Sequence, residues 1–336
     1  MIYKILVIGC GHIGEEHLKD IYYRENIEIA AVVDWNEELA RLTARKYGAK
    51  AWGNDYKSFL NDKQVDIAIV ATNANSHLSI LKDCLAAGVH VLCEKPIATN
   101  LKDAEEFVAA AKASEAKVLV GHILRHNETF CKVGEMIRAD VIGHPIVMRM
   151  VQNHHAKNWP RYKRLMEDCP PIVDCGVHYF DIMQWYTGEK IVQVGGMKAS
   201  IDPDTPEGTY NYGLVTVKLS GSSVGYYEAG WSNTVAAENL KEFIGPKGRI
   251  SITLSGNRVD NREEGDLITC YHYPEGTYET INVQAQYKPT YRQLEALIGM
   301  IEGGEEASPT LDEVYSSFKV ALTADQALRE ERVIKI

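Results

Sequence analysis

The sequence of 336 residues predicts an α/β chain of two domains. The first is a doubly wound parallel sheet, and the second is an α+β domain with a large, mainly antiparallel open sheet. Three observations support this. An apolar run at 5–8 leads into spaced glycines, strands then alternate with helices for about 120 residues, and strand-like runs beyond that follow one another without helices. We expect the domains to span 1–122 and 123–308, and the C-terminal helix within 309–336 to pack back on the first domain.

The first apolar run ends in Gly9, Gly11 and Gly14, which are spaced as G-x-G-x-x-G where a helix opens. In a strand–turn–helix unit, the first glycine permits a tight turn and the second lets the backbone approach a pyrophosphate. The third lets helix and strand pack closely, and the helix N-terminus offers N–H groups to the phosphates. The turn therefore predicts a dinucleotide site of the Rossmann type, with His12 and Ile13 beside the glycines.

A second buried strand is expected at 27–34 and ends in Asp34, about 20 residues after the glycine turn. A carboxylate at this place accepts hydrogen bonds from ribose hydroxyls, and its charge disfavours the 2′-phosphate of NADP. Trp35 follows, and no arginine stands beside it for such a phosphate. We therefore expect NAD as cofactor, with Asp34 and Trp35 contacting it. The alternative is that Asp34 only caps the helix expected at 37–47.

The alternation continues through the first domain. Parallel strands joined by right-handed crossovers place ligands beyond the carboxyl ends of the strands, so the residues that follow each strand are the candidates. Those residues are Thr72 and Asn73, then Glu94 and Lys95, then 122–125. Helices are expected at 12–23, 55–61, 76–87 and 101–114, and strands at 66–71, 89–93 and 117–121.

The pattern changes from about residue 123, because consecutive strands without intervening helices are typical of an antiparallel sheet. A helix at 128–139 and a strand at 145–155 come first, then a loop at 159–164 and a helix at 174–185. Strands are expected at 192–200, 210–219, 223–231, 240–244, 249–254, 268–273 and 278–283, and helices at 289–302 and 311–331.

Lys95 stands between Glu94 and Pro96, directly after a buried strand. A lysine whose pKa is lowered by burial or by a nearby cation can donate and accept a proton, and it can also hold a substrate hydroxyl. The alternative is a surface lysine paired with Glu94. The position after the strand, and the proline that fixes the turn, favour the functional interpretation.

Asp174 and His178 form a second candidate pair, because residues four apart share one face of a helix. Asp181 lies one further step along that face. A carboxylate beside an imidazole orients the ring and stabilises its charged form, and histidine suits the removal of a hydroxyl proton near neutral pH. The alternative is a helix-capping aspartate and a core histidine.

The other histidines are weak candidates for metal ligands. His122 and His126 are four apart, and His154 and His155 end a strand, so each pair could give two ligands. No H-E-x-x-H and no cysteine–histidine set accompanies them, and we expect no metal site. Pocket lining or core packing is the favoured interpretation, and we expect His154 to bind substrate.

Three aromatic residues of the second domain are candidates for stacking: Trp159, Tyr162 and Trp231. Each could stack on a sugar ring, although aromatic side chains more often serve packing. We expect Trp159 to contact the substrate.

Composition limits the function classes. The formal charge of −10 argues against nucleic-acid binding. No apolar stretch approaches the ~20 residues of a membrane span, and the N-terminus lacks a signal-peptide pattern. Seven dispersed cysteines without a C-x-x-C pair are typical of reduced thiols, so we expect a cytoplasmic protein.

Taken together, the segments 9–14, 94–96 and 174–178 occur in the order and at the separations typical of one family. The chain resembles the Gfo/Idh/MocA oxidoreductases over essentially its whole length. The resemblance implies a Rossmann domain followed by an α/β domain whose open sheet forms homodimers or homotetramers. It also implies NAD(P)-dependent hydride transfer to or from a sugar, inositol or related polyol.

The resemblance also implies individual roles. Lys95 would contact the reacting hydroxyl and the nicotinamide, Asp174 would support it, and His178 would be the acid or base. Thr72 and His77 match a cofactor-side segment in which Asn73 replaces the usual proline, and Arg125 matches an arginine near the substrate.

Two departures from the family pattern concern the substrate. Asp168-Cys169-Pro170-Pro171 stands where glycines are common, and His126 and Glu128 stand where an aromatic residue and a proline are common. Two other functions stay open. One is a non-catalytic NAD(P)-binding regulatory protein, and the other is an NAD-dependent glycoside hydrolase.

Overall fold

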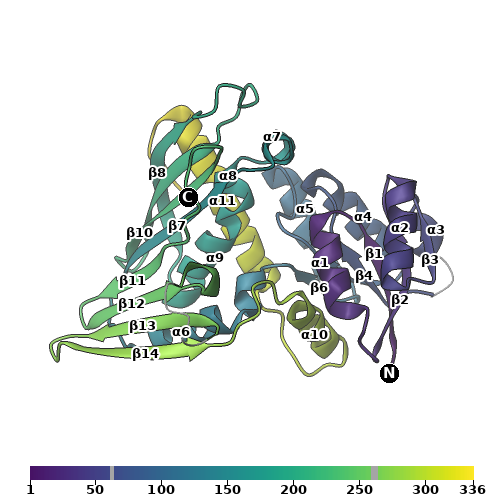
Figure 1. The fold of residues 1–336 in the computed structure, drawn as a ribbon, viewed down its shortest axis with the longest axis horizontal. Coiled ribbons are helices and arrows are strands. Elements are labelled where there is room, and N and C mark those ends of the chain that lie inside the picture. The colour runs from purple at the N-terminus through teal and green to yellow at the C-terminus, as the bar shows by residue number, and fades with distance from the viewer. Residues whose placement is uncertain (61–63, 259–263) are drawn as a thin grey trace. The chain divides into compact units, whose positions relative to one another are not determined.

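The computed structural model describes residues 1–60, 64–258 and 264–336. The chain divides into two compact units (Figure 1). Unit 1 contains Met1–Ile123 and Lys288–Tyr315, and unit 2 contains Leu124–Tyr287 and Ser316–Ile336. The segment that follows the second unit in sequence therefore groups with the first, and the chain ends in unit 2.

The centre of unit 1 is a six-stranded parallel sheet in the order β3-β2-β1-β4-β5-β6. The order reverses between β1 and β4, so the topological switch point lies at the carboxyl ends of these two strands. The edge strand β3 was not expected, because three residues are too short to show a strand period. The strands are β1 (Tyr3–Ile8), β2 (Ile27–Val33), β3 (Ala51–Gly53), β4 (Ile67–Val70), β5 (His90–Cys93) and β6 (Val118–Val120).

The helices of unit 1 begin and end where local sequence signals place them. Asn36 caps α2 by accepting a hydrogen bond from the Leu39 amide, and Gly48 ends that helix in the left-handed conformation. The expected helix at 55–61 is shorter, and its last residue, Asn61, lies outside the described residues. The helices are α1 (His12–Ile21), α2 (Glu37–Tyr47), α3 (Lys57–Leu60), α4 (Ala74–Ala86) and α5 (Leu101–Ala113).

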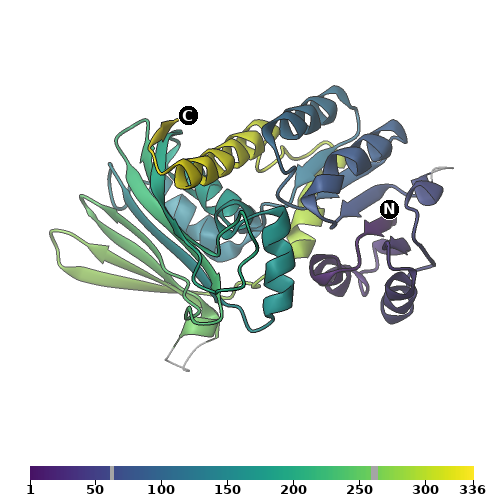
Figure 2. The same cartoon turned by 90° about the horizontal axis from the view of Figure 1, so that it is seen from above.

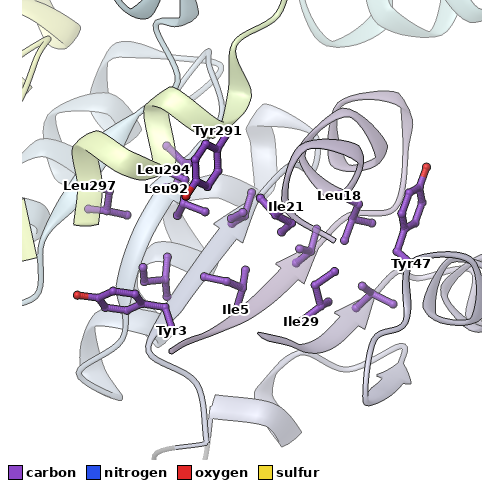
Figure 3. Packing of buried hydrophobic residues seen from close by; sticks show 14 of the residues in the cluster. Tyr3, Ile5, Leu18, Ile21, Ile29, Tyr47, Leu92, Tyr291, Leu294 and Leu297 are labelled. Carbon is purple, nitrogen blue, oxygen red and sulfur yellow. The ribbon is translucent and has the colours of Figure 1, made fainter. Parts of the chain in front are cut away.

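Helix α10 (Thr290–Ile301) packs on the core of unit 1. Figure 3 shows Tyr291, Leu294 and Leu297 of this helix beside Leu92 of the sheet. These apolar residues are spaced three apart, so they form one buried stripe. This packing corrects the expectation that residues through 308 belong with the second sheet.

Unit 2 is built on a nine-stranded sheet in the order β14-β13-β12-β11-β7-β10-β9-β8-β15. All its pairs are antiparallel except β7 with β10, in agreement with the expected, mainly antiparallel sheet. The strands are β7 (Val147–His155), β8 (Ile191–Ala199), β9 (Tyr212–Leu219), β10 (Val224–Ser232), β11 (Lys241–Gly245), β12 (Gly248–Thr253), β13 (Asp266–His272), β14 (Thr277–Val283) and β15 (Ile334–Lys335).

The long helices of unit 2 lie on one side of this sheet (Figure 2). The covered face carries residues such as Tyr227, whose ring packs edge-on against Phe180. The opposite face presents Val147 and Val224, which are paired in register and 42% and 41% exposed. The helices are α6 (Glu128–Arg138), α7 (Trp159–Asp168), α8 (Pro171–Asp174), α9 (Gly176–Thr187) and α11 (Leu311–Glu330), of which α11 begins in unit 1.

The expected loop at 159–164 is wrong, because these residues lie in α7. Asn158 caps the helix by accepting from the Arg161 amide, and Pro160 stands in the first turn, where a missing N–H costs nothing. Among the helices in the described ranges, none combines the length and the apolar character needed to cross a membrane.

Candidate active site

The glycine turn of unit 1 has the geometry that a dinucleotide requires. Gly9 has φ +99°, and a Cβ atom on it would lie 2.4 Å from the Ala71 carbonyl oxygen. A Cβ atom on Gly14 would lie 1.9 Å from the Gly9 carbonyl oxygen, which explains the close packing of helix on strand. A Cβ atom on Gly11 would meet nothing within 4 Å. The first and third glycines are therefore needed by the fold, whereas the second leaves room for a ligand.

Asp34 is fixed beside this turn. Its Oδ2 accepts from the Cys10 amide at 2.9 Å, and its Oδ1 accepts from the Asn36 amide at 2.9 Å. Each carboxylate oxygen retains a lone pair for a further donor. Helix α2 is capped by Asn36, so the alternative role of Asp34 as its cap is wrong.

Two neighbours of the turn are mostly in solvent. Trp35 is 89% exposed, so its expected contact with a cofactor rests on its position after Asp34. His12 is exposed at the start of α1, and its Nε2 lies 2.9 Å from Lys288 Nζ. Ile13 is half-buried behind it.

His77 connects the turns that follow β4 and β5. Its ring is buried, with Nδ1 2.9 Å from the Pro96 carbonyl oxygen and Nε2 3.1 Å from the Thr72 carbonyl oxygen. Burial lowers the pKa of His77, although the two carbonyls act against this shift. Thr72 also bonds Ser76 through their hydroxyls, whereas Asn73 caps α4 without a side-chain hydrogen bond. His77 therefore links the backbone at Thr72 to the backbone at Pro96, in the turns that follow β4 and β5.

Glu94 and Lys95 differ sharply in environment. The carboxylate of Glu94 is buried and lies 2.8 Å from His17 Nε2. Burial would raise the pKa of Glu94, but the hydrogen bond from His17 and the nearby positive charges outweigh it and hold that pKa below its usual value. Lys95 is partly exposed, while every other residue from 91 to 98 is buried. At the end of this strand, Lys95 is therefore accessible and Glu94 is buried. The expected contact of Glu94 with the cofactor stays a prediction.

The segment that carries Asp174 and His178 shows the same contrast in unit 2. From 171 to 184, these two residues are partly exposed and all others are buried. The single expected helix is two, because α8 ends at Asp174 and α9 begins at Gly176. At this break the helical hydrogen bond spans three residues instead of four, because the His178 amide donates to the Cys175 carbonyl oxygen. Asp174 and His178 therefore sit on either side of a helix break rather than on one continuous helix.

The prolines before this segment fit the helix start. Pro170 occupies the N-cap and Pro171 the first position of α8, where the missing N–H would have no helical partner. Glu128 likewise opens α6, next to the capping Asn127, where a negative charge suits the helix dipole. Pro170, Pro171 and Glu128 are thus accommodated by helix starts, whereas His126 ends the short 3-10 helix Ile123–His126.

Arg125 is already engaged by a carboxylate. Its Nε donates to Asp181 Oδ2 at 2.8 Å, and its Nη2 donates to Asp181 Oδ1 at 2.7 Å. Both side chains are buried, and the guanidinium also lies 4.9 Å from the Trp185 ring centre. This bidentate pair anchors α9, and a contact of Arg125 with substrate stays a prediction.

A buried lysine in unit 2 was not singled out from the sequence. Lys241 is 1% exposed, its Nζ donates to the Val151 carbonyl at 2.7 Å, and it lies 4.7 Å from the Tyr179 ring centre. Burial lowers the pKa of Lys241 to about 7, although the charge of nearby Cys175 acts against this. The available signal was that Lys241 shares a strand face with the apolar Phe243.

The aromatic candidates separate into two environments. Trp159 Nε1 donates to both carboxylate oxygens of Asp204 at 2.9 Å, so its polar edge is engaged. Trp231 is 1% exposed and stacks on His154, with ring centres 6.5 Å apart. Tyr162 packs on the same indole at 5.5 Å. A Trp231 face is therefore not open to a sugar ring, and stacking by this residue is excluded by burial.

The described residues were also compared with the requirements of a metal site. Within the described residues, no group of three or more His, Cys, Asp or Glu side chains is placed to hold a metal ion. The site chemistry that can be assigned is that of an amine, an imidazole and carboxylates.

The comparison with known families addresses both units. Residues 3–122 match the model of an oxidoreductase family with an NAD-binding Rossmann fold, and residues 130–251 match the GFO/IDH/MocA C-terminal domain. The chain belongs to the GFO/IDH/MocA family. Membership confirms the predicted family and the class of NAD-binding oxidoreductase.

Individual relatives agree with this membership. The chain is 24% identical to a myo-inositol 2-dehydrogenase of Thermotoga maritima, over 99% of this chain and 98% of the relative. Among solved structures, the fold is similar to myo-inositol 2-dehydrogenase from Lactobacillus plantarum, with a TM-score of 0.84, 18% identity and 100% of both chains covered. It is also similar to an aldose–aldose oxidoreductase from Caulobacter crescentus, with a TM-score of 0.85, 20% identity and 100% of both chains covered. These likenesses confirm the predicted fold in this GFO/IDH/MocA chain.

Proposed function

We propose that this chain is an NAD-dependent dehydrogenase that oxidises a secondary alcohol of a cyclic polyol or sugar, or reduces the corresponding ketone. The observation that carries the proposal is the selective exposure of Lys95, Asp174 and His178 within otherwise buried segments. Ionisable side chains left accessible in such segments serve chemistry more readily than packing. The inositol 2-dehydrogenase among the relatives supports the polyol class.

The residues of unit 1 fit a dinucleotide. Gly11 leaves open space at the helix N-terminus, where backbone N–H groups favour a pyrophosphate. The fixed Asp34 carboxylate would accept from both ribose hydroxyls and repel a 2′-phosphate, which supports NAD over NADP. His12, Ile13, Trp35, Thr72, Asn73, His77, Glu94 and Lys95 complete the proposed cofactor surroundings. Bound NAD supplies the chemistry of accepting a hydride.

The proposed proton handling follows from the side-chain types. His178 accepts the hydroxyl proton as the alcohol becomes a ketone and returns it in the reverse direction. Asp174 orients the imidazole and stabilises its charged form. Lys95 donates a hydrogen bond to the reacting oxygen and stabilises its developing negative charge. Arg125, His154 and Trp159 stay proposed substrate contacts.

The alternative functions find less support. A non-catalytic regulatory protein has no need of an accessible lysine and histidine in buried segments. A glycoside hydrolase would release an aglycone without net NADH, and the relatives described above are not named as hydrolases. A cytoplasmic location is part of the proposal, supported by seven dispersed cysteines without a C-x-x-C pair.

A substrate screen tests the proposed function. Purified protein is mixed with NAD or NADP and with inositols, aldoses, sugar phosphates and nucleotide sugars, and reduction is followed by absorbance. We expect NADH formation with at least one inositol or aldose, and NAD to give at least about 10-fold higher kcat/KM than NADP. No reduction across the panel in either direction, or a preference for NADP, would contradict the proposal.

We further propose a homodimer or homotetramer formed through the sheet of unit 2. The face opposite its helices carries exposed apolar side chains, among them Val147 and Val224. Light scattering with size-exclusion chromatography is expected to show a dimer or tetramer that V224E shifts toward the monomer. A monomeric wild-type protein would contradict this part of the proposal.

A further inference from the structure

Two polar side chains stand diagonally on neighbouring strands of unit 2. Trp231 of β10 pairs in register with His154 of β7, and Gln152 of β7 pairs with Ala229. Since alternate residues share a face, Gln152 and Trp231 lie on the same face, as diagonal neighbours. Tyr227 lies on this face too and packs against α9. Gln152 and Trp231 therefore project from the helix-covered side of the sheet.

Both side chains carry a buried polar atom without a hydrogen-bond partner among the described residues: Nε1 of Trp231 and Oε1 of Gln152. The rings around the indole, His154 and Tyr162, contact it through their faces and edges and do not take its N–H. A buried donor or acceptor left unpaired destabilises a folded protein. Two such atoms from neighbouring residues call for an explanation.

The two atoms are complementary in kind, since one donates and the other accepts. An alcohol hydroxyl satisfies both, as a water molecule would, because it accepts from the indole N–H and donates to the amide oxygen. An ammonium would satisfy only the amide oxygen, and a carboxylate only the indole. The uncharged character of the pair therefore selects a neutral hydroxyl over an ionic group.

The pair belongs to the same layer as the proposed catalytic helix break. Helices α8 and α9 pack on β10, and Tyr179 of α9 stacks on Tyr227 with ring centres 4.7 Å apart. Trp231 lies four residues further along β10, beneath Tyr162. Since His154 and Tyr162 cover the ring of Trp231, a ligand over this face would meet the edge of the indole that carries Nε1.

We propose that Gln152 and Trp231 form a hydroxyl-recognition pair that selects a polyol by a hydroxyl other than the one oxidised. This inference rests on the proposed dehydrogenase function and deepens it. It gives Trp231 the role of a hydrogen-bond donor rather than a stacking platform. A site built to bond a substrate hydroxyl rejects the analogue that lacks it.

The test compares W231F with the wild type on one polyol substrate and its monodeoxy analogues, each lacking one non-reacting hydroxyl. The substitution removes the indole N–H but keeps an aromatic ring. For the wild-type holoenzyme, we expect one analogue to lose about 10- to 100-fold in kcat/KM. For W231F, the parent polyol should fall by a similar factor and this analogue should fall no further. Q152L should give the same pattern, and W52F, on the exposed edge strand β3, should leave all ratios unchanged.

The possible results distinguish a hydroxyl-recognition pair from a packing role of Trp231 and from an internal water. An equal loss for the parent and every analogue, or a loss below 2-fold, would show that Trp231 serves packing or an internal water, and the inference is overturned. If the wild type oxidises no polyol, the proposed function fails. Calorimetric titration of the same ligands into the NADH-bound protein then tests the recognition pair on its own. The pair requires that binding of the polyol depends on one hydroxyl and that W231F abolishes this dependence.

Discussion

The candidate site of one unit of this oxidoreductase is formed by backbone geometry, and that of the other unit by side chains. In unit 1, backbone geometry within a few residues makes the site: Gly9 and Gly14 allow close packing, and Gly11 leaves room. In unit 2, side chains from distant segments make it, such as Asp174 at a helix break and Trp231 on a strand. A backbone site can be recognised from local spacing, whereas a side-chain site becomes visible only when the sheet register is known.

The largest expected effect concerns the accessible ionisable residues of the two units. K95M and H178N are each expected to lower kcat at least 100-fold with little change in unfolding temperature, since acid–base groups contribute about 10²–10⁴-fold. H144N, at an exposed turn histidine, is the matched control and should retain wild-type rates. Near-normal turnover in both K95M and H178N would remove these residues from the chemistry.

The glycine turn offers a comparison within unit 1. G14A places a methyl group 1.9 Å from the Gly9 carbonyl oxygen and should cost about 2–3 kcal/mol of unfolding free energy. G11A meets no atom within 4 Å, so its stability should match the wild type while its Kd for NADH rises about 10-fold or more. Denaturant unfolding and NADH fluorescence titration measure the two effects. Unchanged NADH binding in G11A would mean that the open space is not used by the cofactor.

Lys241 offers the corresponding comparison in unit 2. Because burial lowers its pKa to about 7 while the unfolded chain keeps the proton to about 10.4, the unfolded state binds more protons between these values. Stability from this residue therefore rises with pH, by about 2–3 kcal/mol from pH 7 to pH 9. Urea unfolding at both pH values should show that the unfolding free energy of the wild type, minus that of K241M, rises by this amount from pH 7 to pH 9. A constant difference would mean that Lys241 stays charged in the folded protein.

The sequence was sufficient for features whose cause is local. The alternation of strands and helices predicted the parallel sheet, and the three glycines predicted the turn, because each glycine has a steric reason within the motif. The antiparallel sheet of unit 2 followed from consecutive strand patterns.

The features that escaped prediction depend on tertiary contacts. The stripe of Tyr291, Leu294 and Leu297 shows that α10 buries one face, but not which sheet it covers. The partner of Glu94 could not be predicted either, because His17 lies in α1, far from Glu94 along the chain. The unpaired Nε1 of Trp231 depends in the same way on the residues that surround it in the fold.

Direct hydride transfer is the central claim, and an isotope measurement tests it most simply. Wild-type protein is incubated with NAD and an inositol carrying deuterium on the carbon that is oxidised, and the reduced cofactor is analysed by mass spectrometry. We expect reduced cofactor that is one mass unit heavier than that formed from unlabelled inositol, because the hydride moves from the carbinol carbon to the nicotinamide. Reduced cofactor without deuterium, or none at all from any labelled polyol that binds, would contradict it.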